Sequence, residues 1–472
     1  MTPDPVFMRI ERDPLGEHAV PADAYYGIQT VRAVENFPIS GLRAPAELVT
    51  ATVLVKKAAT QANIALARLD RRVGEAIVQA ADEILSGALA DQFIVDVYQA
   101  GAGTSHNMNV NEVLANRASE ILGGAKGEYR LVHPNDHVNM GQSTNDVFPT
   151  ATRLALLLTH GALVEAARAL ATSLGRKADA FTSVMKVGRT HLQDAVPITL
   201  GQEFGGYAAC IERAADDVVR ASEGLKELNL GATAVGTGLN AGDDYTTRAV
   251  ANIGTLSGID VTPAVNRFRV TQSMGDVLAY SGTLRRLAME LSKIASDLRL
   301  LSSGPRAGLS EITLPAVQPG SSIMPGKVNP SVPEMVNQVC YQVYGCDATI
   351  CASAEAGQLE LNVMMPVIAW NALHSSTILR NAMNTLRTRT VDGIEADEGR
   401  CRELLERSTA AATSLSPYIG YAKTAEIAKA AVATGRSIRD LVLERGLMDA
   451  QQLDRVLSVE AMTRPGISGE KS

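Results

Sequence analysis

Residues Gly320 to Pro330 read G-S-S-I-M-P-G-K-V-N-P, and the rest of the chain is organised around this stretch. Pro325 and Pro330 lack the backbone N–H that a helix needs, so the segment must be a loop. It offers hydroxyls, backbone N–H groups and the cation of Lys327, which together suit a small anion. The alternative is a glycine and proline hinge that carries no chemistry.

The spacing of this loop excludes one common phosphate-binding motif. The pattern G-x-x-x-x-G-K-[ST] needs four residues between its glycines and a hydroxyl after the lysine. Here five residues separate Gly320 from Gly326, and Val328 follows Lys327. The loop is therefore expected to hold its anion in another way.

Length and composition favour a large and mostly helical protein. The length leaves room for about three domains of ordinary size. Hydrophobic residues make up 46% of the 472 residues but aromatic residues only 4%, which favours closely packed helices over sheets. The net charge of −7 and the lack of a basic run argue against nucleic acid or an anionic membrane as a partner.

The start of the chain and its cysteines predict a soluble, cytoplasmic protein. The sequence M-T-P-D-P-V-F-M-R-I-E-R-D has no apolar signal region, and no later run of about 18 apolar residues is free of charge. His133 and His137 are four residues apart, but Pro134 lies between them, so no metal site is expected. The five cysteines lack C-x-x-C spacing and are expected to be buried and reduced: Cys210, Cys340, Cys346, Cys351 and Cys401.

Two stretches keep a hydrophobic period of about 3.5 residues over about four heptads, as long helices in a bundle do. The first is Phe204, Tyr207, Ile211, Ala214, Val218, Ala221, Leu225 and Leu228. The second is Val277, Tyr280, Leu284, Leu287, Leu291, Ile294, Leu298 and Leu301. A shorter third run directly follows the loop: Val336, Val339, Val343, Cys346 and Ile350. Such long helices, apolar on more than one face, favour the association of several chains.

Residues that commonly cap helices precede a helical run expected over 110–122. Thr104, Ser105 and Asn109 are of this type, and Asn109 has capping-box spacing to Glu112. Alone, such residues are more often caps than ligands.

A second cluster of this kind stands before an apolar helix expected to begin near Val147. It consists of Ser143, Thr144 and Asn145. The partial positive charge of a helix N-terminus lies next to these side chains, so they could also hold an anion.

The composition divides the chain into three expected domains. Residues 1–142 form a mostly helical N-terminal domain with a polar, turn-rich start. Residues 143–396 form the long-helix bundle that carries the loop 320–330. Beyond residue 397 the sequence becomes more charged and its elements shorten, which predicts a small helical domain over 397–472.

The stretch Gly320–Pro330 resembles the signature of the aspartase/fumarase superfamily, and the resemblance covers nearly the whole chain. The signature is highly specific for the superfamily and less so for the substrate. The other segments that carry it are P-A-D-A-Y-Y-G-I-Q-T-V-R-A-V-E-N-F, G-A-G-T-S, Q-S-T-N-D, G-R-T-H-L-Q-D-A-V-P-I, G-A-T-A-V-G-T-G-L-N-A, P-E-M-V-N-Q-V and G-Q-L-E-L-N-V.

This resemblance implies three mostly helical domains, of which the middle one is a bundle of five long helices. It also implies a homotetramer whose bundles form a twenty-helix core, with each active site built from three subunits. It implies no cofactor. The implied partners are small molecules: L-aspartate, fumarate and ammonia.

Within the superfamily, the segments look most like the branch that reversibly deaminates L-aspartate to fumarate and ammonia. V-H-P-N-D, with His133, and N-E-V-L-A-N-R-A-S-E-I-L-G-G are closer to class II fumarases, which interconvert fumarate and malate. Fumarases, however, typically have Q-S-S-N-D where Thr144 stands and L-M-D-A-T-P where Gln193 and Val196 stand. A non-catalytic structural or binding member is a third alternative.

Several positions depart from both enzymes. They are His106 in G-T-S-H-N-M-N, Met365 in N-V-M-M-P, and Ser416 with Tyr418 in S-P-Y-I-G-Y, where N-P-H is usual. The last departure puts any histidine role in the C-terminal domain in doubt. His106 and Met365 leave room for a related amino-acid substrate.

The resemblance implies the breaking of a bond beta to a carboxylate. The proton that leaves is very weakly acidic, so charge develops on the carboxylate as an enediolate, and donors aimed at it should be the largest catalytic term. By resemblance, Ser321 is the base, acting as a serinate. Backbone N–H groups and Lys327 would have to stabilise that anion in a site closed to water.

The remaining roles are carried over residue by residue. The residues implied to hold the reacting carboxylate are Thr104, Ser143, Thr144 and Ser322. Those implied to hold the other carboxylate are Lys327 and Asn329. Those implied to lie near the leaving amine are Asn145, Thr190 and His191, and His191 is the next candidate for the base. Arg32 is a candidate for charge balance.

Overall fold

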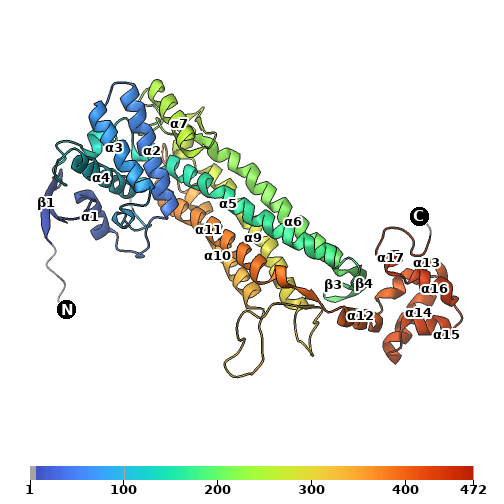
Figure 1. Ribbon diagram of the computed structural model, residues 1–472. Helices are drawn as coiled ribbons and strands as arrows, with labels where there is room; N and C mark the ends of the chain where they lie inside the picture. Colours follow the sequence, from blue (N-terminus) through green and yellow to red (C-terminus); the bar gives the residue numbers. More distant parts are fainter. Residues whose placement is uncertain (1–6, 100, 471–472) are drawn as a thin grey trace. The chain divides into compact units, whose positions relative to one another are not determined.

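The computed structural model describes residues 7–99 and 101–470 and is mostly helical, as the composition predicted. Among the described residues, five helices are longer than twenty residues (Figure 1). They are α5 (Thr144–Ala180), α6 (Leu200–Ser222), α9 (Gly275–Leu301), α10 (Ser331–Glu355) and α11 (Met365–Arg389). The presence of five long helices agrees with the five-helix bundle that the resemblance implied.

The chain divides into two compact units. Unit 1 comprises Met1–Val164, Asp216–Ala288 and Tyr341–Leu379. Unit 2 comprises Glu165–Ala215, Met289–Cys340 and Arg380–Ser472. Each of the five long helices contributes one segment to each unit. The three domains expected from composition stay a prediction.

The heptad pattern identified core positions correctly. All eight positions of the second run lie on α9 and are buried, from Val277 to Leu301. In the first run Ala221 alone is partly exposed. α6 ends at Ser222, so the buried Leu225 and Leu228 lie beyond the helix that this run predicted. Burying one face of each helix in this way removes most of its apolar surface from water, at about 25 cal/mol per Å².

α5 is long and apolar enough, by length and composition alone, to cross a membrane. Most of its apolar window is instead buried inside the fold. The helix also carries Arg153, whose fully buried guanidinium pairs with both carboxylate oxygens of Asp276, at 2.6 and 3.1 Å. α5 is therefore a core helix of the protein.

The N-terminal elements of unit 1 pack on a large hydrophobic core between α2, α3 and α4 and on a small cluster of Val20, Ala24 and Ile28. β1 (Met8–Asp13) and β2 (Gly16–Pro21) form an antiparallel hairpin, and α1 (Ile28–Asn36) follows. α2 (Ala46–Ala65) packs against α3 (Arg71–Leu85), α4 (Thr104–Ile121) and α7 (Asp243–Ser257) (Figure 1). The core between α2, α3 and α4 includes Val53, Ile77, Val113 and Leu114.

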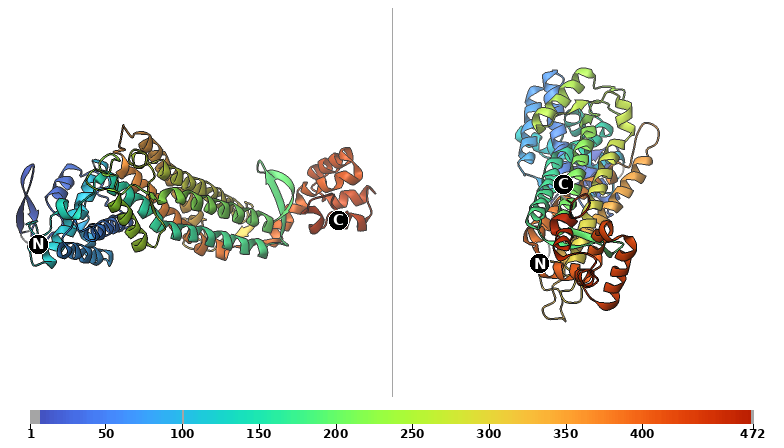
Figure 2. Two further views of the ribbon diagram at one scale, coloured as in Figure 1. Left: turned by 90° about the horizontal axis from the view of Figure 1, so that it is seen from above. Right: turned by 90° about the vertical axis from the view of Figure 1, so that its right-hand side faces the viewer.

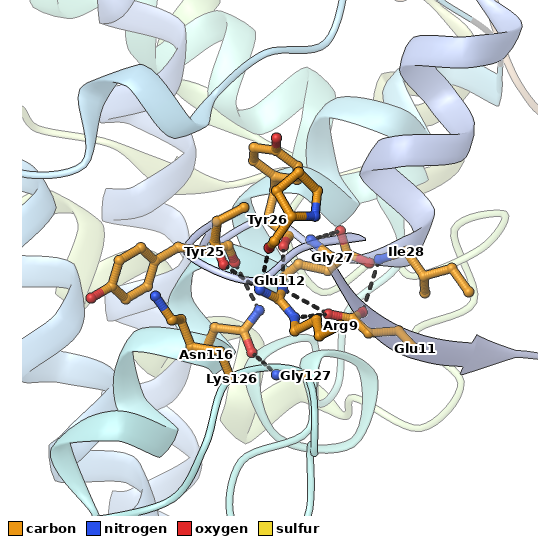
Figure 3. A network of polar contacts seen from close by, with 12 residues as sticks. Arg9, Glu11, Tyr25, Tyr26, Gly27, Ile28, Glu112, Asn116, Lys126 and Gly127 are labelled. Carbon is orange, nitrogen blue, oxygen red and sulfur yellow. Dashed lines mark hydrogen bonds and ion pairs between the residues drawn. The ribbon is translucent and has the colours of Figure 1, made fainter. Parts of the chain in front are cut away.

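Two buried carboxylates hold the start of α1 (Figure 3). Glu112 of α4 accepts hydrogen bonds from the backbone N–H groups of Gly27, Gln29 and Thr30, and from the Thr30 hydroxyl at 2.6 Å. Glu11 of β1 accepts another from the N–H of Ile28 at 2.9 Å. The first N–H groups of a helix have no partner inside the helix, so these acceptors fix α1 in place.

The expected capping box of Asn109 and Glu112 is wrong. α4 begins five residues earlier, at Thr104, so both residues lie inside the helix. Asn109 accepts from the N–H of Ile94 at 3.2 Å, and Glu112 bonds to residues at the start of α1 that lie 82 to 85 positions away in the sequence. Burial raises the pKa of Glu112 to about 7, although the hydrogen bonds from Thr30 and the backbone oppose the shift.

Unit 2 contains a hairpin that the sequence analysis did not anticipate. β3 (Met185–Thr190) pairs antiparallel with β4 (Gln193–Thr199). The hairpin packs against α12 (Glu398–Arg407) and the turn over 410–415 (Figure 2). The helices that follow are α13 (Ser416–Ile419), α14 (Tyr421–Thr434), α15 (Ile438–Glu444), α16 (Ala450–Val456) and α17 (Val459–Met462), and they share a core built on Leu415, Ile427, Leu441, Val442 and Leu453.

The remaining elements are short. α8 spans Arg267–Gln272, and a single π turn spans Pro134–Val138. β5 (Glu227–Leu228) pairs with β6 (Thr262–Pro263), and β7 (Ile312–Thr313) pairs with β8 (Glu395–Ala396).

Candidate active site

The loop Gly320–Pro330 lies in unit 2, between α9 and α10 (Figure 1). Its ends are joined, because the N–H of Gly320 donates to the carbonyl of Lys327 at 2.8 Å and the Asn329 amide donates to the carbonyl of Gly320 at 2.6 Å. A Cβ at position 320 would lie 2.5 Å from the Lys327 carbonyl oxygen, so this close approach requires glycine.

Inside the loop, the Ser321 hydroxyl oxygen is an acceptor of two backbone hydrogen bonds. The N–H of Ile323 lies at 3.2 Å from it and the N–H of Met324 at 3.0 Å. Taken alone, this is a local serine turn, which such hydroxyls often form. The same two donors would stabilise negative charge on this oxygen, since hydrogen bonds to the charged form of a group favour that form.

Ser322 and Lys327 are exposed on this loop. The Lys327 ammonium forms no hydrogen bond or ion pair with any part of the chain that the structure describes. Lys327 and Asn329 line a cleft of about 500 Å³ together with residues 302–305 and Arg299. The loop therefore presents the cation of Lys327 to this cleft.

Thr190 and His191 stand at the tip of the β3–β4 hairpin in unit 2. Thr190 pairs with Gln193, which leaves a two-residue turn formed by His191 (φ +57°) and Leu192 (φ +58°). Two positive φ values are typical of a type I′ turn, where asparagine and glycine are the usual residues. The backbone thus holds His191 in a conformation that non-glycine residues adopt at a cost, with its ring exposed.

One buried carboxylate anchors strand β3 of that hairpin. Glu311 is fully buried and binds Arg189 through both oxygens, at 3.0 and 2.9 Å. Lys186 of β3 is also buried, and its ammonium contacts Glu311 at 3.2 Å and Glu203 at 2.8 Å. Because Glu311 lies ten residues before Ser321, the hairpin is tied to the segment that leads into the loop.

Ser143, Thr144 and Asn145 lie in unit 1, at the start of α5. Ser143 caps the helix, because its hydroxyl accepts from the N–H of Asn145 at 3.2 Å and the Asp146 carboxylate accepts from the N–H of Ser143 at 2.9 Å. This reciprocal pair is a capping box with aspartate in place of glutamate. The cap-type prediction is confirmed for Ser143 only, because Thr144 and Asn145 lie inside α5.

Asp146 does more than cap α5. Its second oxygen accepts from the N–H groups of Gly231 and Thr233, at 3.0 and 2.8 Å. The Asn145 amide donates to the carbonyl of Ala234 at 2.8 Å, which fastens the same glycine-rich segment from its other side. Burial raises the pKa of Asp146 to about 7, while the three backbone donors and Lys56 oppose the shift.

Thr104 is the first residue of α4 and is exposed in unit 1. Its hydroxyl donates to the carbonyl of Gly101 at 2.6 Å, so its hydrogen is already used. The preceding Gly103 has φ +96°, and a Cβ there would overlap the ring of Phe148. The glycines of G-A-G-T-S therefore place Thr104 close to the start of α5, where Phe148 lies.

Arg32 has a partner that gives it a structural role. Its guanidinium binds both oxygens of Asp13, at 2.9 and 3.1 Å. Burial raises the pKa of Asp13, but the hydrogen bonds from Arg32 and the backbone outweigh it and the net pKa is lowered. No hydrogen bond or ion pair among residues 7–99 and 101–470 links Arg32 to Thr104 or to the 143–145 cluster.

The structure thus groups the candidate residues in two sets. Unit 1 holds Arg32, Thr104, Ser143, Thr144 and Asn145. Unit 2 holds Thr190, His191, Ser321, Ser322, Lys327 and Asn329. The sequence analysis missed Asp146, which bonds to Ser143, and Glu311, which binds Arg189 next to Thr190. The S-T-N-D spacing could have identified Asp146, whereas no local pattern marks Glu311.

The positions that depart from the expected pattern are structural in this fold. His106 is buried, bonds to the Thr52 hydroxyl at 2.9 Å and packs edge-on against Phe148. Met365 is fully buried at the start of α11. The Tyr418 hydroxyl donates to the carbonyl of Ser468 at 2.7 Å, which holds the C-terminal segment.

His133 and His137 use their rings to order the turn between them. The Nδ1 of His137 accepts from the N–H of His133 at 2.9 Å, and the Nδ1 of His133 accepts from the N–H groups of Asn135 and Asp136. Within the described ranges no three His, Cys, Asp or Glu side chains gather as a metal site would require.

Comparisons with known proteins identify relatives over nearly the full chain. The model of a family described as lyase matches residues 16–345, and that of the fumarase C C-terminus matches residues 412–464. An aspartate ammonia-lyase of Bacillus subtilis (strain 168) is 50% identical over 98% of each chain. One from Escherichia coli (strain K12) is 48% identical, again over 98% of each.

Two solved structures have the same fold. The fumarate lyase:delta crystallin of Brucella melitensis, bound to cobalt, superposes with a TM-score of 0.94 at 51% identity, covering 97% of this chain and 100% of that one. The class II fumarase of Schistosoma mansoni superposes with a TM-score of 0.93 at 36% identity, with the same coverage.

Proposed function

This chain belongs to the lyase family, and from that premise we propose that it is an aspartate ammonia-lyase, a carbon–nitrogen lyase that converts L-aspartate reversibly to fumarate and ammonia. The observation that carries this proposal is an identity of about half over nearly the whole length of both chains. Its substrates are accordingly aspartate, fumarate and ammonia, and its place in the cell is the cytoplasm.

The chemistry asks the protein to remove a weakly acidic proton next to a carboxylate. Ser321 is the base in this proposal. The two N–H groups that already point at its hydroxyl oxygen support this role, because they lower the cost of a serinate. The exposed Lys327 lies six residues away in the same loop and adds positive charge once the site closes and excludes water.

Charge then develops on the reacting carboxylate as an enediolate. Ser143, Thr144 and Ser322 are proposed to donate hydrogen bonds to it, which is the arrangement that most lowers such a barrier. Thr104 can join them only when its hydroxyl gives up the carbonyl of Gly101, to which it donates in this structure. The cap geometry of Ser143 supports its part, because its oxygen accepts from Asn145 and no residue among 7–99 and 101–470 accepts its own hydrogen. Lys327 and Asn329 would hold the second carboxylate.

The amine leaves from the face opposite to the base, so the elimination is anti. Asn145, Thr190 and His191 are proposed to surround it, and His191 is the candidate to accept or return a proton there. The exposure of Thr190 and His191 at the tip of the hairpin supports this assignment, because neither side chain is buried within its own unit. Arg32 is kept as a contributor to charge balance only, because Asp13 already neutralises it.

We propose that four chains assemble through the long helices. Large apolar side chains on α9 and α10 remain exposed in the single chain, among them Met289, Leu300 and Tyr341. Their burial against other copies would complete the bundle, and family membership supports sites shared between subunits. Sedimentation of the purified protein should give a tetramer, and a stable, active monomer would contradict this part of the proposal.

Hydration of fumarate is the second candidate, favoured by the V-H-P-N-D segment that contains His133. One assay separates the two functions, because fumarate absorbs in the near ultraviolet and neither aspartate nor malate does. The protein is supplied with L-aspartate and with L-malate in separate reactions. We expect fumarate from aspartate alone, and fumarate from malate at a comparable rate would favour the second candidate.

A further inference from the structure

A chain of buried polar groups begins at Lys56 and ends at the hydroxyl of Thr144. We propose that Asn107 is a positioning residue that turns the Thr144 hydroxyl outward as a hydrogen-bond donor. Lys56 and Asn139 determine which group donates and which accepts in the hydrogen bonds that lead to Thr144. The inference deepens the proposed function and rests on it, because it concerns the donors that meet the reacting carboxylate. All four residues belong to unit 1.

The first step is the orientation of two amides by Lys56. This side chain is fully buried, and its nitrogen lies 2.8 Å from Asn139 Oδ1 and 2.9 Å from Gln142 Oε1. An ammonium only donates, so both partners must present oxygen. The positions of their NH₂ groups fit this orientation. The NH₂ group of Asn139 donates to the carbonyl of Gln142, and that of Gln142 donates to the carbonyl of Val138.

This orientation does not depend on the charge of Lys56. Burial lowers the pKa of Lys56 to about 7, so part of the population carries a neutral amine. A neutral amine still has two hydrogens, one for each amide oxygen. Asn139 Oδ1 is therefore an acceptor in either state.

The second step fixes Asn107. It lies on α4, and its NH₂ group approaches Asn139 Oδ1 at 3.4 Å and Thr144 Oγ1 at 3.0 Å. The reverse orientation would place the oxygen of Asn107 against that of Asn139 and leave a buried NH₂ without an acceptor. Asn107 thus donates to Thr144, and its own oxygen stays buried without a protein partner in the described chain.

The third step concerns the single hydrogen of the Thr144 hydroxyl. An oxygen that accepts from Asn107 keeps its hydrogen for another acceptor, and among the described residues none accepts it. Thr144 is partly exposed at the N-terminus of α5, where a carboxylate would also meet the helix dipole. If Thr144 instead donated inward, its lone pairs would face the carboxylate and repel it.

Asn111 provides a matched control for Asn107. It lies one turn later on α4, is equally buried, and also donates to Asn139 Oδ1, at 3.3 Å, but it does not contact Thr144. Replacing either asparagine with leucine removes one buried amide of similar size. Only the replacement of Asn107 should act on the reacting carboxylate.

The test is a double-mutant cycle between Asn107 and Thr144 in the full-length protein, with fumarate formation from aspartate as the readout. Thr144→Val removes the donor and should lower kcat/KM by about 10². Asn107→Leu should lower it by about tenfold in the parent, mainly in kcat, but by less than twofold in the Thr144→Val background. Asn111→Leu should change kcat/KM by less than twofold in either background.

A second variant reverses the direction of the hydrogen bond between residue 107 and Thr144. In Asn107→Asp the carboxylate accepts the Thr144 hydrogen and turns it inward, so kcat should fall at least as far as in Thr144→Val. Equal losses from Asn107→Leu in both backgrounds, or a near-parent kcat for Asn107→Asp, would overturn the inference. The proposed function fails separately, and visibly, if the parent protein itself forms no fumarate from aspartate.

Discussion

The hydroxyl oxygen of Ser321 accepts a hydrogen bond from the backbone N–H of Met324 at 3.0 Å, and the N–H of Ile323 adds a second at 3.2 Å. A serine hydroxyl is a very weak acid, so it can remove a proton from carbon only where its anion is stabilised. Here the sequence supplies that stabilisation locally, within three residues of the serine. The arrangement links the fold of the loop to the proposed chemistry.

Replacing Lys327 with alanine should weaken substrate binding and turnover together. A carboxylate would lose its charge-assisted partner, which should reduce kcat/KM by the equivalent of about 2 to 4 kcal/mol. Steady-state kinetics with aspartate measure the effect, and Lys423→Ala, an exposed lysine on α14, is the control. An unchanged apparent affinity for aspartate would remove Lys327 from the site.

His106 should make the protein sensitive to acid. Burial, assisted by the charge of Lys56, lowers its pKa to about 4. Between that value and the unfolded pKa of about 6.5, the unfolded state binds more protons, so the free energy of unfolding should fall as pH falls through this window, by up to about 3 kcal/mol.

The His106→Gln variant tests this prediction, because glutamine can still contact Thr52 but does not titrate. Urea unfolding is measured for both proteins at about pH 7 and about pH 4.5. The parent should lose more stability than the variant over this interval. Equal losses would show that His106 is not the group responsible.

Substitution of Glu311 should reduce the folding stability more than substitution of most other positions in unit 2. Glu311→Ala would leave Arg189 without its carboxylate and the buried Lys186 with Glu203 alone, which should cost about 3 to 5 kcal/mol of stability. Urea unfolding gives the stability, and the fumarate assay shows whether the hairpin tip has moved. The exposed Glu406 on α12 is the control, and its alanine variant should lie within about 0.5 kcal/mol of the parent. A near-parent stability for Glu311→Ala would show that the hairpin is anchored elsewhere.

The sequence was most informative where structure is decided locally. Two prolines made 320–330 a loop, a repeating apolar spacing identified the buried face of α9, and Ser143 signalled a helix start. It was least informative where one side chain serves a distant segment. Glu112 and Gly27 lie 85 residues apart, and Glu311 and Arg189 lie 122 apart, so no spacing rule connects them.

The β3–β4 hairpin escaped prediction for a related physical reason. Its turn contains His191 and Leu192 instead of the glycine or asparagine that marks such turns, so the local signal was missing. The candidate residues themselves came from resemblance to a family. The structure adds their surroundings: Asp146 bonds to Ser143, Asn107 donates to Thr144, and Glu311 binds Arg189 beside Thr190.

Ser322 and Ser321 should respond differently to the same substitution. Ser322 is assigned one hydrogen bond to the developing enediolate, so Ser322→Ala should keep a measurable rate, reduced by about 10² to 10³. Ser321→Ala should abolish turnover while aspartate still binds. Steady-state kinetics on both variants check this, and equal rates for the two would mean that neither serine has a special role.

Solvent deuterium exchange at the β-carbon of aspartate tests the account most directly, because it follows the proton that the base removes. The parent protein and the Ser321→Ala and Ser322→Ala variants are each incubated with aspartate in heavy water, and NMR follows the exchange in each sample. Exchange should be lost in Ser321→Ala and retained, at a reduced rate, in Ser322→Ala. Exchange at near the parent rate in Ser321→Ala would contradict the assignment of the base and make His191 the next candidate.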